Sequence, residues 1–316
     1  MKEYVVGIDI GGTNTVFGFV DNLGNCIHKA SFSTQQYPDP LLFVAKLSEQ
    51  IQNSIQALPN AHVKGIGIGA PNGNFYKGTI EFAPNLKWKG VVHLAQLFQT
   101  HFAMPVLLTN DANAAAIGEM MYGNAKGMKD FILITLGTGV GSGIVSNGNM
   151  MYGHDGFAGE IGHVIVFPEG RKCGCGRRGC LEAYCSAKGI IKTYVALLNS
   201  PDPYYEDSHP EITPQTIFEL ASKGDHVALD TFEYTGRILG QALANSVAYT
   251  SPEAIFLFGG IANAGPLLFN PIRKSLEENL LNIYKHKIKI LPSGIKENDA
   301  AILGAASLIW NSIAKN

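Results

Sequence analysis

Four metal-binding side chains lie close together in one segment of the chain. His163, Cys173, Cys175 and Cys180 follow the pattern His-x9-Cys-x-Cys-x4-Cys. Three thiolates and one imidazole are a common tetrahedral ligand set for structural zinc. Unpaired thiols or a disulfide are the alternatives, but a disulfide between Cys173 and Cys175 would be strained. We therefore predict a closed Zn²⁺ site with a structural role.

Two carboxylates flank this cluster. Glu160 lies three residues before His163, and Glu182 lies two residues after Cys180. A metal that fixes the cysteine loop would also fix these carboxylates and the imidazole. We therefore expect removal of the metal to abolish substrate binding as well as to lower stability.

A glycine turn follows the first apolar strand, which is predicted over Tyr4–Ile10. Its sequence is Asp9-Ile10-Gly11-Gly12-Thr13-Asn14. Glycines let phosphate oxygens approach backbone N–H groups, and they permit the positive φ angles that point those groups inward. Thr13 and Asn14 can add side-chain donors, and Asp9 is placed to hold Mg²⁺ through water. A tight hairpin with a capping aspartate is the alternative.

A second glycine turn, Gly137-Thr138-Gly139-Val140-Gly141, lies between strands predicted over 131–136 and 142–145. Two such turns in matching contexts favour a polyphosphate held from both sides. Neither turn matches a P-loop, and Gly11-Gly12 is followed by strand residues rather than by the helix of a Rossmann fingerprint. A third loop, at Gly259 and Gly260, could let an adenine ring lie against the backbone.

Asn110 and Asp111 lie at a predicted junction between a strand and a helix. Both residue types are preferred N-caps, which is one interpretation. The other is that Asp111, ionised at the positive end of a helix, accepts a proton from an attacking hydroxyl during phosphoryl transfer. A polyol acceptor needs several hydrogen-bonding partners, and the candidates are Asn85, Asn110, Glu160, His163 and Glu182.

The pattern of strand, glycine turn, strand and Asn/Gly turn occurs twice, which predicts two equivalent halves around a shared cleft. Strands alternate with helices, one of them after Pro40 and an alanine-rich one over Ala112–Tyr122. An α/β fold with mostly parallel sheets is therefore expected. We predict an N-terminal lobe over 1–111, a C-terminal lobe with the zinc loop over 112–299, and a helix over about 300–316 that packs back on the first lobe. Ser200–Pro214 is predicted to be an exposed loop.

Composition narrows the class of protein. The 316 residues are 46% hydrophobic and only 16% charged, which excludes intrinsic disorder. The 24 basic and 26 acidic residues give a net charge of −2, so nucleic-acid binding has no electrostatic support. Neither a signal peptide nor a membrane helix is expected. Five cysteines, three of them clustered, favour a metal in a reducing compartment, and hence a cytoplasmic protein.

Five motifs together resemble the ROK family of repressors and sugar kinases. They are Asp9–Asn14, Asn110-Asp111-Ala112-Asn113-Ala114, Leu136–Gly143, Gly159-Glu160-Ile161-Gly162-His163 and Cys173–Glu182. The segment Pro84-Asn85-Leu86-Lys87-Trp88 is also similar to a family motif. One departure is Asn72 in Ala70-Pro71-Asn72-Gly73, where the family usually has Pro-Gly.

This resemblance implies an actin-like ATPase (ribonuclease H-like) fold with two lobes, and ATP-dependent phosphorylation of a hexose at its 6-hydroxyl by a homodimer. It implies that Asp111 is the catalytic base, that Asn85, Asn110, Glu160, His163 and Glu182 bind the sugar, and that His163 also serves zinc through its other ring nitrogen. Glucose is the expected acceptor. The alternatives are N-acetylglucosamine, N-acetylmannosamine, fructose, mannose or allose, and a sugar-sensing regulator is a further possibility. The regulator is disfavoured because only eight residues precede Asp9.

Overall fold

The computed structural model describes residues 2–58, 60–198 and 212–315. Residues 200–211 of the predicted loop at Ser200–Pro214 lie outside the described residues. The chain divides into two compact units. Unit 1 comprises Met1–Met128, Gly143–Gly159 and Ser293–Asn316, and unit 2 comprises Lys129–Ser142 and Glu160–Pro292. Each unit is described by itself below.

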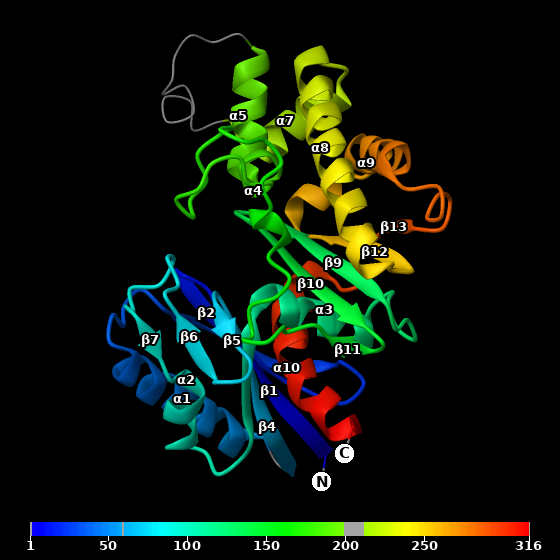
Figure 1. Ribbon diagram of the computed structural model, residues 1–316. Helices are drawn as coiled ribbons and strands as arrows, with labels where there is room; N and C mark the ends of the chain where they lie inside the picture. Colours follow the sequence, from blue (N-terminus) through cyan, green and yellow to red (C-terminus); the bar gives the residue numbers. More distant parts are fainter. Residues whose placement is uncertain (1, 59, 199–211, 316) are drawn as a thin grey trace. The chain divides into compact units, whose positions relative to one another are not determined.

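Unit 1 is built on a five-stranded sheet with the order β3-β2-β1-β4-β8 (Figure 1). The strands are β1 (Lys2–Ile10), β2 (Asn14–Val20), β3 (Cys26–Ser33), β4 (Ala61–Ala70) and β8 (Val106–Asn110). The first three form an antiparallel meander, whereas β1, β4 and β8 are parallel. The expectation of mostly parallel sheets is therefore wrong, because the glycine turn joins β1 directly to β2 without a crossover.

The two faces of this sheet carry different residues, because side chains alternate along each strand. Ile8 and Ile68 point to the face covered by helix α1 (Pro40–Ala57), and the core there includes Phe43 of that helix. Asp39 caps α1 by accepting a hydrogen bond from the Leu41 N–H, and Pro40 follows as its first residue. The predicted helix after Pro40 is therefore confirmed.

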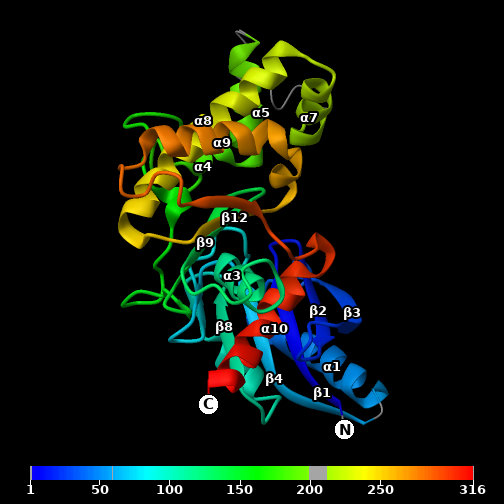
Figure 2. The same ribbon diagram turned by 90° about the vertical axis from the view of Figure 1, so that its right-hand side faces the viewer.

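The opposite face of the sheet is lined by glycines and covered by the C-terminal helix α10 (Glu297–Lys315). A Cβ atom on Gly7 or Gly67 would collide with the α10 backbone, at Ile302 and Ala305 respectively. Glycine is therefore required at both positions for the helix to lie directly on β1 and β4. Figure 2 shows α10 beside α3 (Asp111–Tyr122), and the two helices are in contact.

Glu119 of α3 fixes the point at which the chain returns to unit 1. Its buried carboxylate accepts hydrogen bonds from the backbone N–H groups of Asn124 and Gly294 and from the hydroxyl of Ser293.

Unit 1 also contains helix α2 (Leu94–Gln99) and a small sheet of β5 (Gly73–Asn74), β6 (Thr79–Glu81) and β7 (Val91–Val92).

The second sheet has the order β11-β10-β9-β12-β13. Its strands are β9 (Phe131–Leu136), β10 (Val140–Ser146), β11 (Asn149–Met150), β12 (Ala254–Phe258) and β13 (Lys289–Pro292). Strands β9, β12 and β13 are parallel, and β10 pairs antiparallel with β11. The strand order and the directions of these pairs thus repeat those of the first sheet, so the predicted duplication is confirmed.

Unit 2 also contains a group of helices. They are α4 (Glu182–Cys185), α5 (Ala187–Leu197), α7 (Pro214–Ser222), α8 (His226–Thr250) and α9 (Pro266–Asn279), with short 3₁₀ turns η1 (Ile161–His163) and η2 (Gly260–Ala264). Helices α8 and α9 run side by side in Figures 1 and 2, and Gly240 of α8 leaves room for the backbone of α9 at Ile272. Within the described residues, no helix combines the length and apolar character that a membrane span needs.

Candidate functional site

Two aspartates lie near the carboxyl ends of neighbouring strands in unit 1. Asp9 is the second-last residue of β1, and Asp111 begins α3 directly after β8. Both flank Gly69 of β4, where a Cβ atom would lie 3.6 Å from Oδ1 of Asp9 and 3.8 Å from Cα of Asp111. The parallel pairing of β1, β4 and β8 therefore brings two predicted functional carboxylates together.

The electrostatics of this pair favour protonation. Burial and, to a lesser extent, the negative charge of Asp111 together raise the pKa of Asp9 to about 7. Burial of its carboxyl also raises the pKa of Asp111, although the residue keeps an exposed surface and the backbone N–H groups of Ala112 and of Asp111 itself lower it. A raised pKa makes each carboxylate a better proton acceptor or cation ligand than an isolated aspartate.

Asn110 is the N-cap of α3. Its Oδ1 accepts a hydrogen bond of 2.8 Å from the Ala112 N–H, and Oδ1 of Asp111 accepts from the same group at 2.8 Å. The capping interpretation therefore holds for Asn110. Asp111 occupies the first turn of the helix, where the helix dipole favours its charged form.

The first glycine turn is closed by a hydrogen bond from the Gly11 N–H to the Asn14 oxygen (3.0 Å). Thr13 and Asn14 are exposed. Gly12 lies against Asn85, so the predicted phosphate turn and a predicted sugar ligand are neighbours. The expected positive φ angles are wrong, because Gly11 and Gly12 both lack them. These glycines are needed for close approach, not for a left-handed conformation.

The second glycine turn joins β9 to β10. The Gly137 N–H donates to the Gly139 oxygen (3.0 Å), and the Gly137 oxygen accepts from the Ala187 N–H (2.8 Å). A Cβ atom on Gly139 would lie 2.6 Å from Oε2 of Glu182, and the same oxygen accepts a hydrogen bond from the Val140 N–H (3.1 Å). Neither Gly137 nor Gly139 has a positive φ. This turn therefore positions one of the predicted sugar-binding carboxylates.

The four predicted metal ligands converge in unit 2. The donor atoms of His163, Cys173, Cys175 and Cys180 all lie within 4.8 Å of one another. Sγ of Cys175 is 3.7 Å from Sγ of Cys180, and Sγ of Cys173 is 3.8 Å from Nδ1 of His163. Two sulfurs of a zinc tetrahedron with Zn–S bonds of about 2.3 Å are about 3.8 Å apart. The donor set and its spacing therefore fit a bound metal ion.

The cysteine loop also contacts two residues that are predicted to bind the substrate, Glu182 and His163. The Cys173 thiol donates to Oε1 of Glu182 (3.4 Å), and the guanidinium of Arg177 donates to the His163 carbonyl oxygen (2.7 Å). Burial raises the pKa of Cys175, but hydrogen bonds from Arg177 and the neighbouring thiols outweigh it and lower the value to about 7. Nδ1 is the ring nitrogen of His163 that faces Cys173. Glu160 precedes η1 and is exposed.

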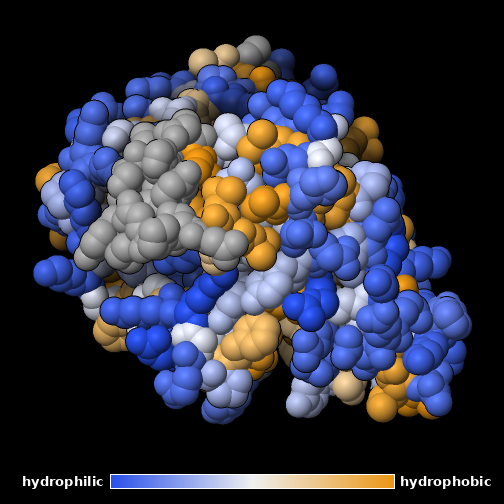
Figure 3. Space-filling model, turned by 90° about the horizontal axis from the view of Figure 1, so that it is seen from above, coloured by the Kyte–Doolittle hydropathy of each residue, from blue (hydrophilic) through white to orange (hydrophobic). Residues whose placement is uncertain are grey.

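Unit 2 contains a cavity of about 340 Å³ beside the second glycine turn. Gly137, Thr138 and Gly260 line it, which are three of the predicted nucleotide-binding residues. Gly259, with a φ of +102°, packs against Leu136. The remaining walls come from α5, α7, α8 and η2, and their apolar side chains include Phe218, Phe232 and Ile261. Figure 3 shows apolar side chains gathered near the middle of the side on which α5, α7 and α8 lie.

Sequence reasoning missed the contribution of α7. The sequence predicts that Pro214 ends an exposed loop, yet Thr213, Pro214 and Gln215 line the cavity. Thr213 is the N-cap of α7, and its side chain accepts from the Thr216 N–H in a capping box. A threonine cap followed by proline is a signal that could have revealed this helix.

Comparisons with known proteins agree with these motifs. The model of the ROK family matches residues 5–312. A glucokinase of Halalkalibacterium halodurans is 34% identical, over 97% of this chain and 95% of its own. A ROK family glucokinase from Streptomyces griseus, solved in complex with glucose and AMPPNP, has a TM-score of 0.79 and 33% identity, over 96% of this chain and 98% of its own. A xylose repressor of Bacillus spizizenii is 30% identical, over 97% of this chain and 77% of its own.

Proposed function

This chain belongs to the ROK family, and on that premise we infer that it is an ATP-dependent glucokinase. It transfers the γ-phosphoryl group of ATP to the 6-hydroxyl of a hexose, with glucose as the acceptor. The observation that carries this function is the likeness over nearly the whole chain to a glucokinase solved with glucose and an ATP analogue. The duplicated mixed sheets belong to the actin-like ATPase fold that ROK sugar kinases share.

Asp111 is the base of the reaction. Its carboxylate takes the proton of the sugar 6-hydroxyl, the hydroxyl oxygen attacks the γ-phosphorus, and ADP leaves as the bond to the β-phosphate oxygen breaks. Burial raises the pKa of Asp111, and a higher pKa makes proton transfer from an alcohol less unfavourable. Its place at the first turn of α3 fixes the carboxylate, because the preceding Asn110 caps the same helix.

The acceptor is held by hydrogen-bonding side chains, for which the candidates are Asn85, Asn110, Glu160, His163 and Glu182. The proposal is supported by the contact that holds the Glu182 carboxylate, which accepts a hydrogen bond from the Val140 N–H. A side chain that is held before the substrate arrives loses little freedom when the substrate binds. For Asn85, the backbone is placed by its contact with Gly12.

ATP is bound by the glycine turns and by the cavity of unit 2. The adenine ring enters the cavity beside Gly260, where Phe218, Phe232 and Ile261 offer apolar surface. The N–H groups of Gly12, Thr13 and Asn14 and of Thr138 and Gly139 donate to the phosphates. Gly11 and Gly137 shape these turns, because their own N–H groups donate to the Asn14 and Gly139 oxygens. Gly259 gives the backbone its left-handed turn before Gly260.

Mg²⁺ accompanies the nucleotide, and Asp9 is the residue that would hold it. The fit is supported by the pKa of Asp9, about 7, which reflects a carboxylate that burial and Asp111 make costly to ionise. A divalent cation removes that cost by supplying a positive charge. When bound, the ion neutralises charge on the transferring phosphoryl group.

His163, Cys173, Cys175 and Cys180 hold a structural Zn²⁺, as their donor spacing supports. Such an ion fixes the loop that carries His163 and ends at Glu182. We further propose that the protein is cytoplasmic and acts as a homodimer, in keeping with its clustered cysteines and with its ROK membership.

A coupled assay with several sugars tests this function. ADP formation is measured with glucose, N-acetylglucosamine, N-acetylmannosamine, fructose, mannose and allose at equal concentrations. Glucose is expected to give the highest kcat/KM. Activity on none of these hexoses would remove the kinase function, and a higher kcat/KM for another sugar would replace glucose as the acceptor.

A further inference from the structure

Phe82 has an unusual backbone conformation for an aromatic residue. Its φ is +52°, and among the described non-glycine residues with positive φ it is the one apolar side chain. Such a conformation costs free energy for a bulky residue, and proteins tend to keep it where function needs it. The cost is not offset by burial, because Phe82 is 70% exposed.

Hydrogen bonds hold Phe82 in this conformation. Its N–H donates to the Gly90 oxygen (2.8 Å), and its carbonyl accepts from Nδ2 of Asn72 (3.3 Å). Nδ2 of Asn72 also donates to the Glu81 oxygen (2.9 Å). Asn72 itself has a φ of +51°, which asparagine tolerates well. The family departure at position 72 therefore creates the contact that fixes Phe82.

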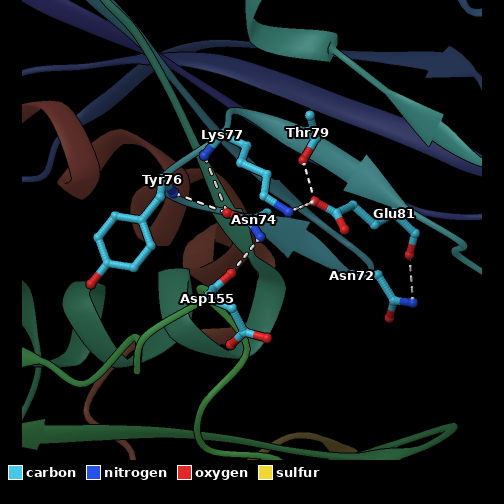
Figure 4. Close-up of polar contacts among 7 residues, drawn as sticks. All are labelled: Asn72, Asn74, Tyr76, Lys77, Thr79, Glu81 and Asp155. Atoms are coloured by element: carbon cyan, nitrogen blue, oxygen red, sulfur yellow. Dashed lines mark hydrogen bonds and ion pairs between the residues drawn. The ribbon is translucent and has the colours of Figure 1, made fainter.

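The strand before Phe82 is also clamped. Figure 4 shows the Glu81 carboxylate accepting from Nζ of Lys77 (3.1 Å) and from the hydroxyl of Thr79 (2.8 Å). In the same view Oδ1 of the buried Asn74 accepts from the N–H groups of Tyr76 and Lys77, and its Nδ2 donates to the Asp155 oxygen. The backbone that carries the exposed ring of Phe82 is thus held by the hydrogen bonds of Glu81 and Asn74.

The segment from Asn72 to Phe82 lies beside Asn85 and Asn110, which are proposed to bind the sugar. A Cβ atom on Gly73, next to Asn72, would lie 2.9 Å from the Asn110 nitrogen. Three residues after Phe82 comes Asn85, whose backbone rests on Gly12. The segment that carries Phe82 is therefore joined at both ends to predicted binding residues of unit 1.

We propose that Phe82 is a specificity-determining residue that contacts the hexose, an inference that rests on the proposed kinase function. The two faces of a glucose ring carry axial C–H groups, and an exposed aromatic ring matches that apolar surface. Asn85 and Asn110 form hydrogen bonds with the hydroxyls at the edge of the sugar, and Phe82 covers one face of the sugar ring. The ring thus selects hexoses whose equatorial hydroxyls leave such a face free.

The substitution Phe82→Gly separates this role from a structural one. Glycine adopts a positive φ without cost, so the thermal midpoint should not fall. KM for glucose should rise on the order of tenfold, as expected for loss of one aromatic contact, whereas KM for ATP should stay the same. Phe82→Tyr should restore KM for glucose. The matched control is His286→Gly, because His286 also has a positive φ, +61°, and lies in unit 2.

The outcomes are distinguishable. An unchanged KM for glucose in Phe82→Gly, with an active wild-type enzyme, overturns the role of Phe82 and leaves the kinase function standing. An inactive wild-type enzyme removes the kinase function itself. A change in molecular mass in Phe82→Gly, measured by light scattering, would mean that the ring contacts a second copy of the chain, and this too overturns the proposal. A tenfold change in both KM values would show a structural effect and would overturn it as well.

Discussion

Gly12 rests directly on the backbone of Asn85: a Cβ atom on Gly12 would lie 2.5 Å from the Asn85 carbonyl oxygen. Gly12 belongs to the turn proposed to bind phosphate, and Asn85 to the segment proposed to bind sugar. Both lie in unit 1. The contact leaves no room for any side chain at position 12. A displacement of one segment must therefore displace the other.

The substitution Gly12→Ala is therefore expected to affect both substrates. The added methyl group must displace the Asn85 backbone, and KM for ATP and KM for glucose should both rise by about tenfold or more, as small displacements in a binding site commonly cost. Steady-state kinetics with each substrate varied in turn measure this. Gly127→Asn is the control, because a Cβ atom there meets nothing within 4 Å and asparagine tolerates its positive φ. A change in KM for ATP alone would contradict the connection.

Asp111→Asn should lower kcat by about 10²–10⁴-fold, the usual contribution of a general base. Glucose binding, followed as a glucose-dependent rise in the thermal midpoint, should persist because the amide keeps the shape of the side chain. Asp225→Asn provides a control at another helix N-terminus, since Asp225 caps α8 through the Ala228 N–H. Near-normal turnover of Asp111→Asn would exclude Asp111 as the base.

The raised pKa of Asp9 predicts a pH-dependent stability. The native state binds this proton up to about pH 7, whereas the unfolded chain releases it near its ordinary value of 3.8. The native state therefore binds more protons between these values, and stability falls as the pH rises through this window.

The substitution Asp9→Asn should remove this fall in stability at high pH, because asparagine does not ionise. In the absence of nucleotide, its thermal midpoint should exceed that of the wild type at pH 8, by about 2–4 °C for each kcal/mol recovered. The difference should vanish below the ordinary pKa of 3.8, where both the folded and the unfolded wild type become protonated at this position. Differential scanning fluorimetry across this range measures it. A constant difference at all pH values would show that the charge of Asp9 is not its cause.

Loss of the metal should abolish glucose binding as well as lower stability. Cys180→Ser removes a ligand from the loop that carries His163 and leads into Glu182, so bound zinc, glucose-induced stabilisation and activity should be lost together. Metal content is measured by mass spectrometry, and glucose binding by calorimetry. Cys26→Ser is the control, because Cys26 lies in β3 of unit 1, outside the cluster. A zinc-free Cys180→Ser protein that binds glucose normally would break the proposed link.

Much of this arrangement could be predicted from local patterns. Asp39 followed by Pro40 indicates the start of α1, and the repeated strand and glycine turn predicts the two equivalent sheets. The four metal ligands converge as their spacing indicates. These features can be predicted because the local sequence determines helix capping, turns and the spacing of metal ligands.

Other features depend on contacts between distant parts of the chain. The need for glycine at position 12 comes from Asn85, and no local pattern reveals that packing. Phe218 and Phe232 meet at one cavity only because α7 and α8 fold together. The strained conformation of Phe82 likewise depends on Asn72 and Gly90. Such relationships require the tertiary structure.

The packing of α10 on Gly7 and Gly67 has a consequence for biosynthesis. The ribosome makes β1 and β4 early but makes α10 only after all of unit 2. Until then the glycine-lined face of the first sheet has no cover, so the nascent chain is expected to expose it throughout translation. Folding of unit 1 should therefore finish after chain release, and ribosome-bound intermediates that lack α10 should be preferred targets for chaperones.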